Sequence, residues 1–292
     1  MTEINLELFQ NVRRIQIRTN RAVSDVFAGQ YESVFKGRGM EFKEVREYVP
    51  GDDIRMIDWN VTARTSIPHV KLLAEERELT VMLMVDLSGS QRFGSAQRFK
   101  SELATELCAV IAFSAIQNND KVGLICFTDD VELYIPPAKG RKHVLRLIRD
   151  LLFYSPKGDS TNIPVAMRFL NNVTRRRTVV FLVSDFFADD FETPLRIANK
   201  KHDIIGVVVS DPRESEIPAA GLVSVEDPET GYRCLIDTSD ARVRDAYAQE
   251  AWKRQQIREE RLKKARVDTI HVSTNRPYTT ELYRFFRMRE KR

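Results

Sequence analysis

The sequence has little cysteine and no long apolar run. Its three cysteines lie far apart and form no C-x-x-C pair, which argues against a disulfide framework and a zinc knuckle (Cys108, Cys126 and Cys234). The longest apolar stretch, from Ala109 to Ile116, is interrupted by Ser114 and is too short to cross a bilayer. We therefore expect no transmembrane segment.

An excess of one charge and a targeting segment are also lacking. The 46 basic and 42 acidic residues leave a net charge of +4, which implies no strong attraction to nucleic acid. Residues 1–7 carry acids where a signal peptide would carry bases, so we expect a cytoplasmic protein. No G-x-x-x-x-G-K-[ST] motif is present, so the chain is not itself a P-loop ATPase.

Four short apolar runs are typical of strands that are buried on both faces of a parallel sheet. They cover residues 81–85, 122–127, 179–183 and 204–209. Helical spacing of apolar residues fills the intervals, from Phe99 to Val110, from Val144 to Leu152 and from Pro164 to about Asn171. This alternation predicts an α/β fold, with a doubly wound, mainly parallel sheet flanked by helices.

Two units are predicted along the chain. Residues 79–292 form the α/β domain, which ends in a hairpin around Pro228–Gly231, a charged helix over 240–264, a short strand over 269–272 and a terminal helix. Residues 1–78 form a smaller N-terminal module with a basic amphipathic helix and a hairpin, because strong turn sequences occupy 37–39 and 50–53.

Side chains that carry only oxygen donors follow two of the predicted strands. Asp86, Ser88 and Ser90 follow the first strand, Asp185 follows the third, and Thr161 lies between them in sequence. Ligands bind doubly wound sheets at the carboxyl ends of strands where the strand order reverses, so these residues meet if their two strands flank that point. Carboxylates and hydroxyls suit a hard ion, and we predict a site for Mg²⁺ or, alternatively, Mn²⁺ or Ca²⁺.

The five residues resemble the complete metal-ion-dependent adhesion site of von Willebrand A domains. In that family the hydroxyls usually bind the metal directly, the aspartates act largely through water, and a partner's Glu or Asp completes the coordination. The resemblance implies a von Willebrand A, Rossmann-like fold and a protein ligand. Because neutral hydroxyls do not cancel the charge of the ion, the metal stays electrophilic toward such a carboxylate.

The N-terminal stretch resembles the signature of an uncharacterised bacterial family. The matching motifs are Gly37-x-Gly39-x-Glu41-Phe42, Arg46-Glu47-Tyr48-Val49-Pro50-Gly51-Asp52-Asp53 and Arg55-x-Ile57-Asp58-Trp59. Members of that family are usually encoded beside MoxR-type AAA+ ATPases. The resemblance implies a bacterial adaptor that is not an enzyme and works with such an ATPase in chaperone-like assembly or regulation of other proteins.

Structural and catalytic alternatives stay open at this point. Ser88, Ser90 and Thr161 are also suited to capping helices. A strand that ends in Asp86 resembles the metal-dependent phosphatases of the haloacid dehalogenase type, although Ser88 stands where their proton-shuttling aspartate would be.

Basic clusters leave a third class of function open, the binding of nucleic acid or of an anionic membrane. The clusters are Arg13, Arg14, Arg18 and Arg21, and Arg175, Arg176 and Arg177. For Asp52, Asp53, Arg55, Asp58 and Trp59 we favour a turn and an ion-paired hairpin over an active site.

Overall fold

A computed structural model of the chain describes residues 31, 34–35, 40–75, 78–95 and 98–291. The strands are β1 (Met40–Glu47), β2 (His69–Glu75), β3 (Thr80–Asp86), β4 (Lys121–Phe127), β5 (Val131–Ala138), β6 (Val179–Ser184), β7 (Asp203–Ser210), β8 (Leu222–Glu226), β9 (Arg233–Asp237) and β10 (Asp268–Ser273). The helices are α3 (Trp59–Thr65), α4 (Lys100–Gln117), α5 (Arg141–Phe153), α6 (Ile163–Val173), α7 (Glu192–Lys201), α8 (Ala241–Ala265) and α9 (Tyr278–Glu290), with short 3-10 turns η1 (Ile54–Met56), η2 (Gly89–Arg92) and η3 (Pro212–Glu214).

The central sheet has six strands in the order β10-β7-β6-β3-β4-β5. Neighbouring strands are parallel except β5, which pairs antiparallel with β4 at the edge. The four apolar runs form β3, β4, β6 and β7, so the predicted α/β class is confirmed. The apolar-run criterion does not predict β5, which contains Pro136 and Pro137 and is tolerated because an edge strand needs fewer backbone donors.

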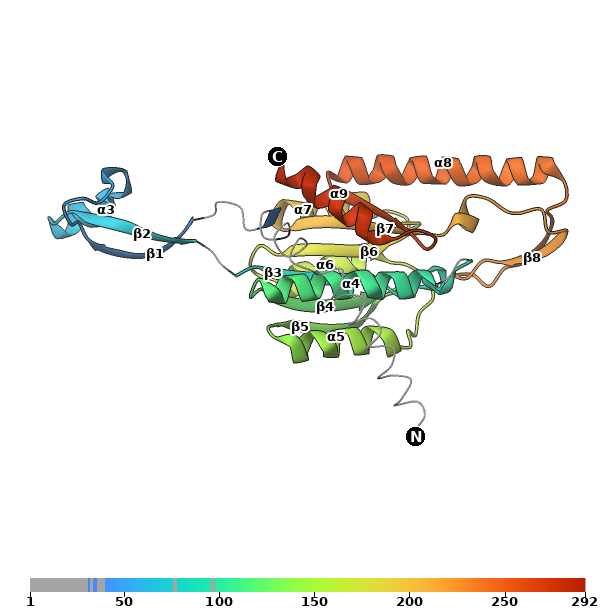
Figure 1. The fold of residues 1–292 in the computed structure, drawn as a ribbon, viewed down its shortest axis with the longest axis horizontal. Coiled ribbons are helices and arrows are strands. Elements are labelled where there is room, and N and C mark those ends of the chain that lie inside the picture. The colour runs from blue at the N-terminus through green and yellow to red at the C-terminus, as the bar shows by residue number, and fades with distance from the viewer. Residues whose placement is uncertain (1–30, 32–33, 36–39, 76–77, 96–97, 292) are drawn as a thin grey trace, which may run out of the picture.

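Helices cover both faces of the sheet, and alternate side chains of each strand enter different cores. Val81, Leu83 and Val85 of β3 pack with α4, α5 and α9 on one face (Figure 1). Met82 and Met84 of the same strand pack with α6, α7 and the end of α8 on the other face. The near-continuous apolar sequence of β3 follows from this double burial.

The strand order reverses at β3. From β3 the chain crosses through α4 to β4 on one side, whereas β6 lies on the other side and continues through α7 to β7. Strands β3 and β6 are hydrogen-bonded neighbours, with Val85 paired to Val183 near their carboxyl ends. These two strands therefore flank the switch point, as the site prediction required.

Strands β1 and β2 pair antiparallel and, with η1 and α3, form a unit that we call the β1–β2 arm (residues 40–75). It lies apart from the six-stranded sheet (Figure 1). Its polar motif residues have structural roles: Asp52 pairs with Arg46 at 2.6 Å, Asp53 caps η1, and Asp58 caps α3. The side chain of Trp59 is exposed.

Only a few residues before the β1–β2 arm are described. The predicted basic helix and the turn at 37–39 lie outside the described residues. Tyr31 and Phe35 are described, and they pack in the α/β core, where the ring of Phe35 lies 6.0 Å from that of Phe181. Within the part of the chain that the structure describes, no helix is long and apolar enough to cross a membrane.

Candidate metal site

Two buried aspartates stand at the carboxyl ends of β3 and β6. Asp86 is the last residue of β3, and Asp185 directly follows Ser184, the last residue of β6. Each aspartate is 1% exposed. Because the two strands are parallel neighbours, their ends bring these carboxyl groups to one edge of the sheet.

Three groups hydrogen-bond to the carboxyl group of Asp86. Ser184 Oγ donates at 2.7 Å, the backbone N–H of Ser88 at 2.9 Å, and Thr161 Oγ1 at 3.2 Å. Burial, followed by the negative charge of Asp185, raises the pKa of Asp86 to about 6. The site is therefore electrostatically negative enough to favour either a proton or a cation.

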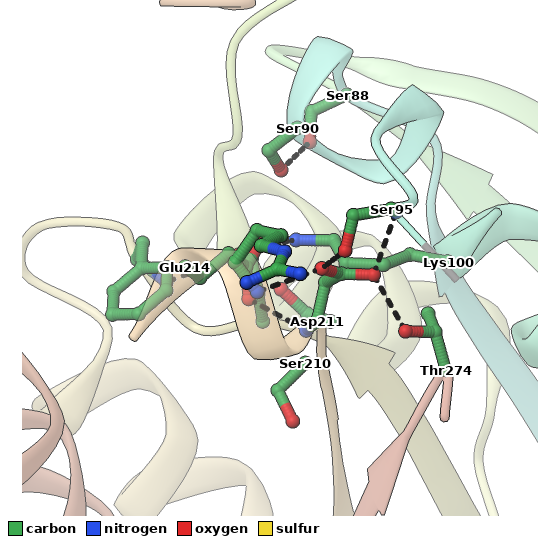
Figure 2. Close-up of polar contacts among 12 residues, drawn as sticks. Ser88, Ser90, Ser95, Lys100, Ser210, Asp211, Glu214 and Thr274 are labelled. Atoms are coloured by element: carbon green, nitrogen blue, oxygen red, sulfur yellow. Dashed lines mark hydrogen bonds and ion pairs between the residues drawn. The ribbon is translucent and has the colours of Figure 1, made fainter. Parts of the chain in front are cut away.

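The predicted hydroxyls face this edge and do not act as helix caps. Ser88 Oγ and Ser90 Oγ lie 3.1 Å apart (Figure 2), and Ser88 makes no side-chain capping bond to η2. Asn162 caps α6 by accepting from the N–H of Val165, which leaves the hydroxyl of Thr161 for Asp86. The capping alternative is thus not realised for Ser88 or Thr161.

Asp185 is paired with a buried ammonium that the sequence reasoning missed. Lys100, the first residue of α4, is fully buried, and its Nζ lies 2.7 Å from Asp185 Oδ2 and 2.5 Å from Glu214 Oε1. Burial alone would raise the pKa of Asp185, but the charge and hydrogen bond of Lys100 lower it overall. Ser90 also donates to Asp185, so all five predicted side chains converge.

The ion pair between Lys100 and Asp185 is part of a larger polar network beside the strand ends (Figure 2). Glu214 accepts the N–H of Asp211, and Asp211 in turn accepts from the hydroxyls of Ser95 and Thr274. The network joins α4, η3 and the loop after β10. These bonds therefore hold the side chains of Lys100 and Glu214 in place beside Asp185.

The loop between β3 and α4 is tied to the loop that carries Thr161. The N–H of Gly89 donates to the carbonyl of Asp159 at 2.8 Å, and Arg92 Nη2 pairs with Asp159 Oδ1 at 2.5 Å. These bonds hold Ser88 and Ser90 on one side of the site and Thr161 on the other.

A carboxyl group from the β8–β9 hairpin (residues 222–237) also enters the site. Glu229 Oε1 lies 3.3 Å from Thr161 Oγ1. Burial, and then the charges of Asp185 and Asp86, raise the pKa of Glu229 to about 7. The sequence predicts the hairpin from its turn, but no local pattern predicts that the turn folds back onto Thr161, 68 residues earlier.

A pocket of about 580 Å³ opens beside these groups, between the β8–β9 hairpin and α8. Ser90, Asp185 and Glu229 line its inner side. The remaining lining includes three arginines and four aromatic residues, namely Arg92, Arg213, Arg254, Phe93, Phe187, Tyr232 and Tyr247. The pocket therefore offers access to the site, and its lining mixes these arginines with acidic side chains, among them Glu214, Glu226 and Asp227.

The donor set fits a hard cation and not zinc. It consists of carboxylate and hydroxyl oxygens, which Mg²⁺ accepts, whereas zinc prefers nitrogen and sulfur. Among the described residues, no three His, Cys, Asp or Glu side chains could hold a metal ion by themselves, so a cation bound by Asp86, Asp185 or Glu229 also depends on the hydroxyls. Burial, and then the charges of neighbouring carboxyl groups, raise the pKa values of Asp86 and Glu229, and a divalent cation would offset both effects.

Comparison with known sequences places the chain among proteins without an assigned function. The family described as "Protein of unknown function DUF58" matches residues 44–257. The uncharacterized protein Rv1480 of Mycobacterium tuberculosis is 29% identical over 283 residues, which cover 96% of this chain and 89% of that protein.

A solved structure shares the fold at low sequence identity. An aerotolerance-related membrane protein from Bacteroides fragilis is 17% identical, with a TM-score of 0.50 over 73% of this chain and all of that chain. The VWA domain of SpRpn10 is 11% identical, with a TM-score of 0.37 over 70% of this chain and 93% of that chain. The predicted cytoplasmic location is wrong on this comparison, because the Bacteroides fragilis structure is that of a membrane protein.

Proposed function

Because the chain belongs to the DUF58 family, whose description gives no function, we propose its role from the candidate metal site: it is an adaptor that binds another protein through a divalent cation. The cation is Mg²⁺, or Mn²⁺ or Ca²⁺ in its place, and its binding residues are Asp86, Ser88, Ser90, Thr161 and Asp185. The observation that carries this proposal is the convergence of two carboxyl and three hydroxyl groups at the switch point of the sheet.

The adjoining pocket supports an acidic partner. Arg92 is paired with Asp159, but Arg213 and Arg254 also line the pocket, and guanidinium groups bind carboxylates well. A cation that is held mainly by neutral hydroxyls keeps charge for one further anionic ligand. An Asp or Glu side chain of a partner protein satisfies both the cation and the arginines.

The β1–β2 arm supplies a second surface for the adaptor. Four large apolar side chains are exposed on it, namely Val49, Ile54, Trp59 and Ile67. By the resemblance of residues 37–59, the proposed partner is a MoxR-type AAA+ ATPase, with which the chain acts in chaperone-like assembly or regulation of other proteins.

The same site argues against a hydrolase. Ser88 stands where a haloacid dehalogenase-type phosphatase needs an aspartate, and a serine hydroxyl does not shuttle protons near neutral pH. The carboxyl group of Asp86 accepts bonds from Ser184 and Ser88 and is buried. A screen with common phosphoesters tests this: metal-dependent turnover that Ser88→Ala abolishes would favour the enzyme.

Recovery of partners from lysate tests the proposal. The chain is used with Mg²⁺, with EDTA, and as the variants Asp86→Ala and Thr161→Val. Asp189→Ala is the control, because that side chain is 96% exposed and lies outside the five proposed ligands. We expect specific partners in Mg²⁺ and in the control, and their loss otherwise. If the same partners are recovered throughout, docking through the metal is wrong.

A further inference from the structure

The turn of the β8–β9 hairpin is seated directly on the loop that carries Ser88 and Ser90. A Cβ atom placed on Gly89 would lie 2.1 Å from the carbonyl oxygen of Pro228, which is far inside contact distance. Gly89 therefore permits an approach that no other residue allows. The backbone of the turn thus contacts the backbone of the loop at Gly89, and the hairpin covers the metal site.

Hydrogen bonds within the turn fix where its side chains point. Asp227 Oδ1 accepts from the N–H of Glu229 at 2.9 Å, and the carbonyl of Asp227 accepts from the N–H of Gly231 at 2.8 Å. Gly231 has a φ of +70°, which closes the turn in the left-handed region. Pro228 and Thr230 are exposed, whereas the side chain of Glu229 turns inward and is partly buried.

Glu229 occupies the place that the proposed function assigns to a partner's carboxylate. Its Oε1 is 3.3 Å from the hydroxyl of Thr161, one of the proposed ligands. The same hydroxyl lies 3.2 Å from Asp86 Oδ2, so Glu229 and Asp86 both contact this proposed ligand. A carboxylate in this position is repelled by its neighbours unless a cation lies between them.

We propose that Glu229 is the chain's own ligand to the cation and that the β8–β9 hairpin thereby closes the metal site. An acidic residue of a partner then has to displace Glu229 before it can reach the metal. This assignment rests on the proposed metal site and adds to it a regulatory element, which the chain itself supplies.

Hydrogen–deuterium exchange and Mn²⁺ titration of the full chain test the assignment together. The variant is Glu229→Gln, which keeps the size of the side chain and removes its charge. The control is Glu226→Gln, which makes the same charge change on the same hairpin, where Glu226 pairs with Arg233 at an exposed position. Exchange is followed over residues 222–237 with Mn²⁺ and with EDTA.

In the wild type and in Glu226→Gln, Mn²⁺ should slow exchange in the hairpin. In Glu229→Gln, Mn²⁺ should bind about tenfold more weakly, because a charged ligand is lost, and saturating Mn²⁺ should no longer slow the hairpin. If Glu229→Gln binds Mn²⁺ as the wild type does and its hairpin still slows, Glu229 is not a ligand and the metal site stands. If the wild type itself binds no Mn²⁺, both the metal site and this assignment are overturned.

Discussion

The β8–β9 hairpin and the β1–β2 arm are both antiparallel strand pairs outside the six-stranded sheet, yet they relate to the candidate metal site in opposite ways. The hairpin returns to the site and places Glu229 beside Thr161. The arm lies apart from the sheet and exposes Trp59 (Figure 1). The hairpin contacts the loops of the buried site at Gly89 and Thr161, whereas the ion pair of the arm is partly open to solvent.

This difference indicates that burial determines how much each polar contact contributes to the free energy of unfolding. Lys100 and Asp185 are at most 1% exposed, whereas the side chains of Arg46 and Asp52 in the arm are 40% and 21% exposed. A buried charge that loses its partner is left uncompensated, but an exposed charge regains water. The predictions below test this contrast.

The largest effect is expected for Lys100→Met. The substitution leaves the carboxyl groups of Asp185 and Glu214 without their shared cation, so the free energy of unfolding should fall by about 3–5 kcal/mol. Arg46→Met in the arm should leave the unfolding midpoint unchanged within error. Denaturant unfolding followed by circular dichroism measures both, and equal losses would contradict the contrast.

A pH titration should change the stability of the α/β body before it affects the capping bonds of the arm. Burial lowers the pKa of His202 to about 4, so the folded chain resists a proton that the unfolded chain accepts below about pH 6.5. The contribution of His202 to the free energy of unfolding, measured as the difference between the wild type and His202→Asn, should fall by about 1–3 kcal/mol as the pH falls from 6.5 to 4.5. The raised pKa values of Asp86 and Glu229 act in the opposite direction in both chains.

Relative to the wild type, the free energy of unfolding of His202→Asn should therefore increase as the pH falls from 6.5 to 4.5. In the arm, hydrogen bonds from backbone N–H groups, Val61 first, lower the pKa of Asp58 below its ordinary value of 3.8. The stability that Asp58 contributes is thus lost only below about pH 4. Loss of structure in the arm between pH 6.5 and 4.5, detected by hydrogen exchange over residues 40–75, would contradict this order.

Two glycine substitutions, one at the hairpin and one in the arm, should have different effects on hydrogen exchange in the hairpin. Gly89→Ala places a Cβ against Pro228 and should raise hydrogen exchange in residues 222–237 about tenfold, because the hairpin must move off the site. Gly51→Ala in the arm meets no atom within 4 Å but strains its own backbone at a φ of +112°. It should leave exchange in the hairpin unchanged. The same exchange in both variants would show that the hairpin is not seated on Gly89.

The smallest effect is expected for the exposed aromatic residues. Trp59 in the arm is 68% exposed and Tyr232 in the hairpin is 70% exposed. Substitution of either by Ala should lower the free energy of unfolding by less than about 0.5 kcal/mol, because little of each ring is buried. A loss as large as that of a core residue for Trp59→Ala would mean that the arm packs against another surface in solution.

Much of the fold could be predicted because burial on both faces leaves a strong local pattern. Strands such as β3 and β6 are continuous apolar runs, and their shared edge follows from the topology of doubly wound sheets. The positions of Asp86 and Asp185 at the strand ends could thus be inferred without coordinates. Strand β5 has no such run, because only part of it is buried and it contains two prolines.

The part of the site that was not predicted from the sequence depends on contacts between residues far apart along the chain. Lys100 is 85 residues from Asp185, and Glu229 is 68 residues from Thr161. Local propensity and periodicity describe the helix and the turn that carry them, but not where those elements pack. Lys100 is the first residue of a helix whose buried face is otherwise largely apolar. Its buried ammonium group is tolerated only because it pairs with the carboxyl groups of Asp185 and Glu214.

Calorimetric titration of Mg²⁺ into EDTA-treated chain tests the metal site most directly. The variant for comparison is Thr161→Val, which keeps the shape of the side chain and removes its hydroxyl, while Asn162 still caps α6. The metal site predicts one Mg²⁺ per wild-type chain and much weaker binding to Thr161→Val. Absence of Mg²⁺ binding to the wild type, or equal binding by both chains, would contradict it.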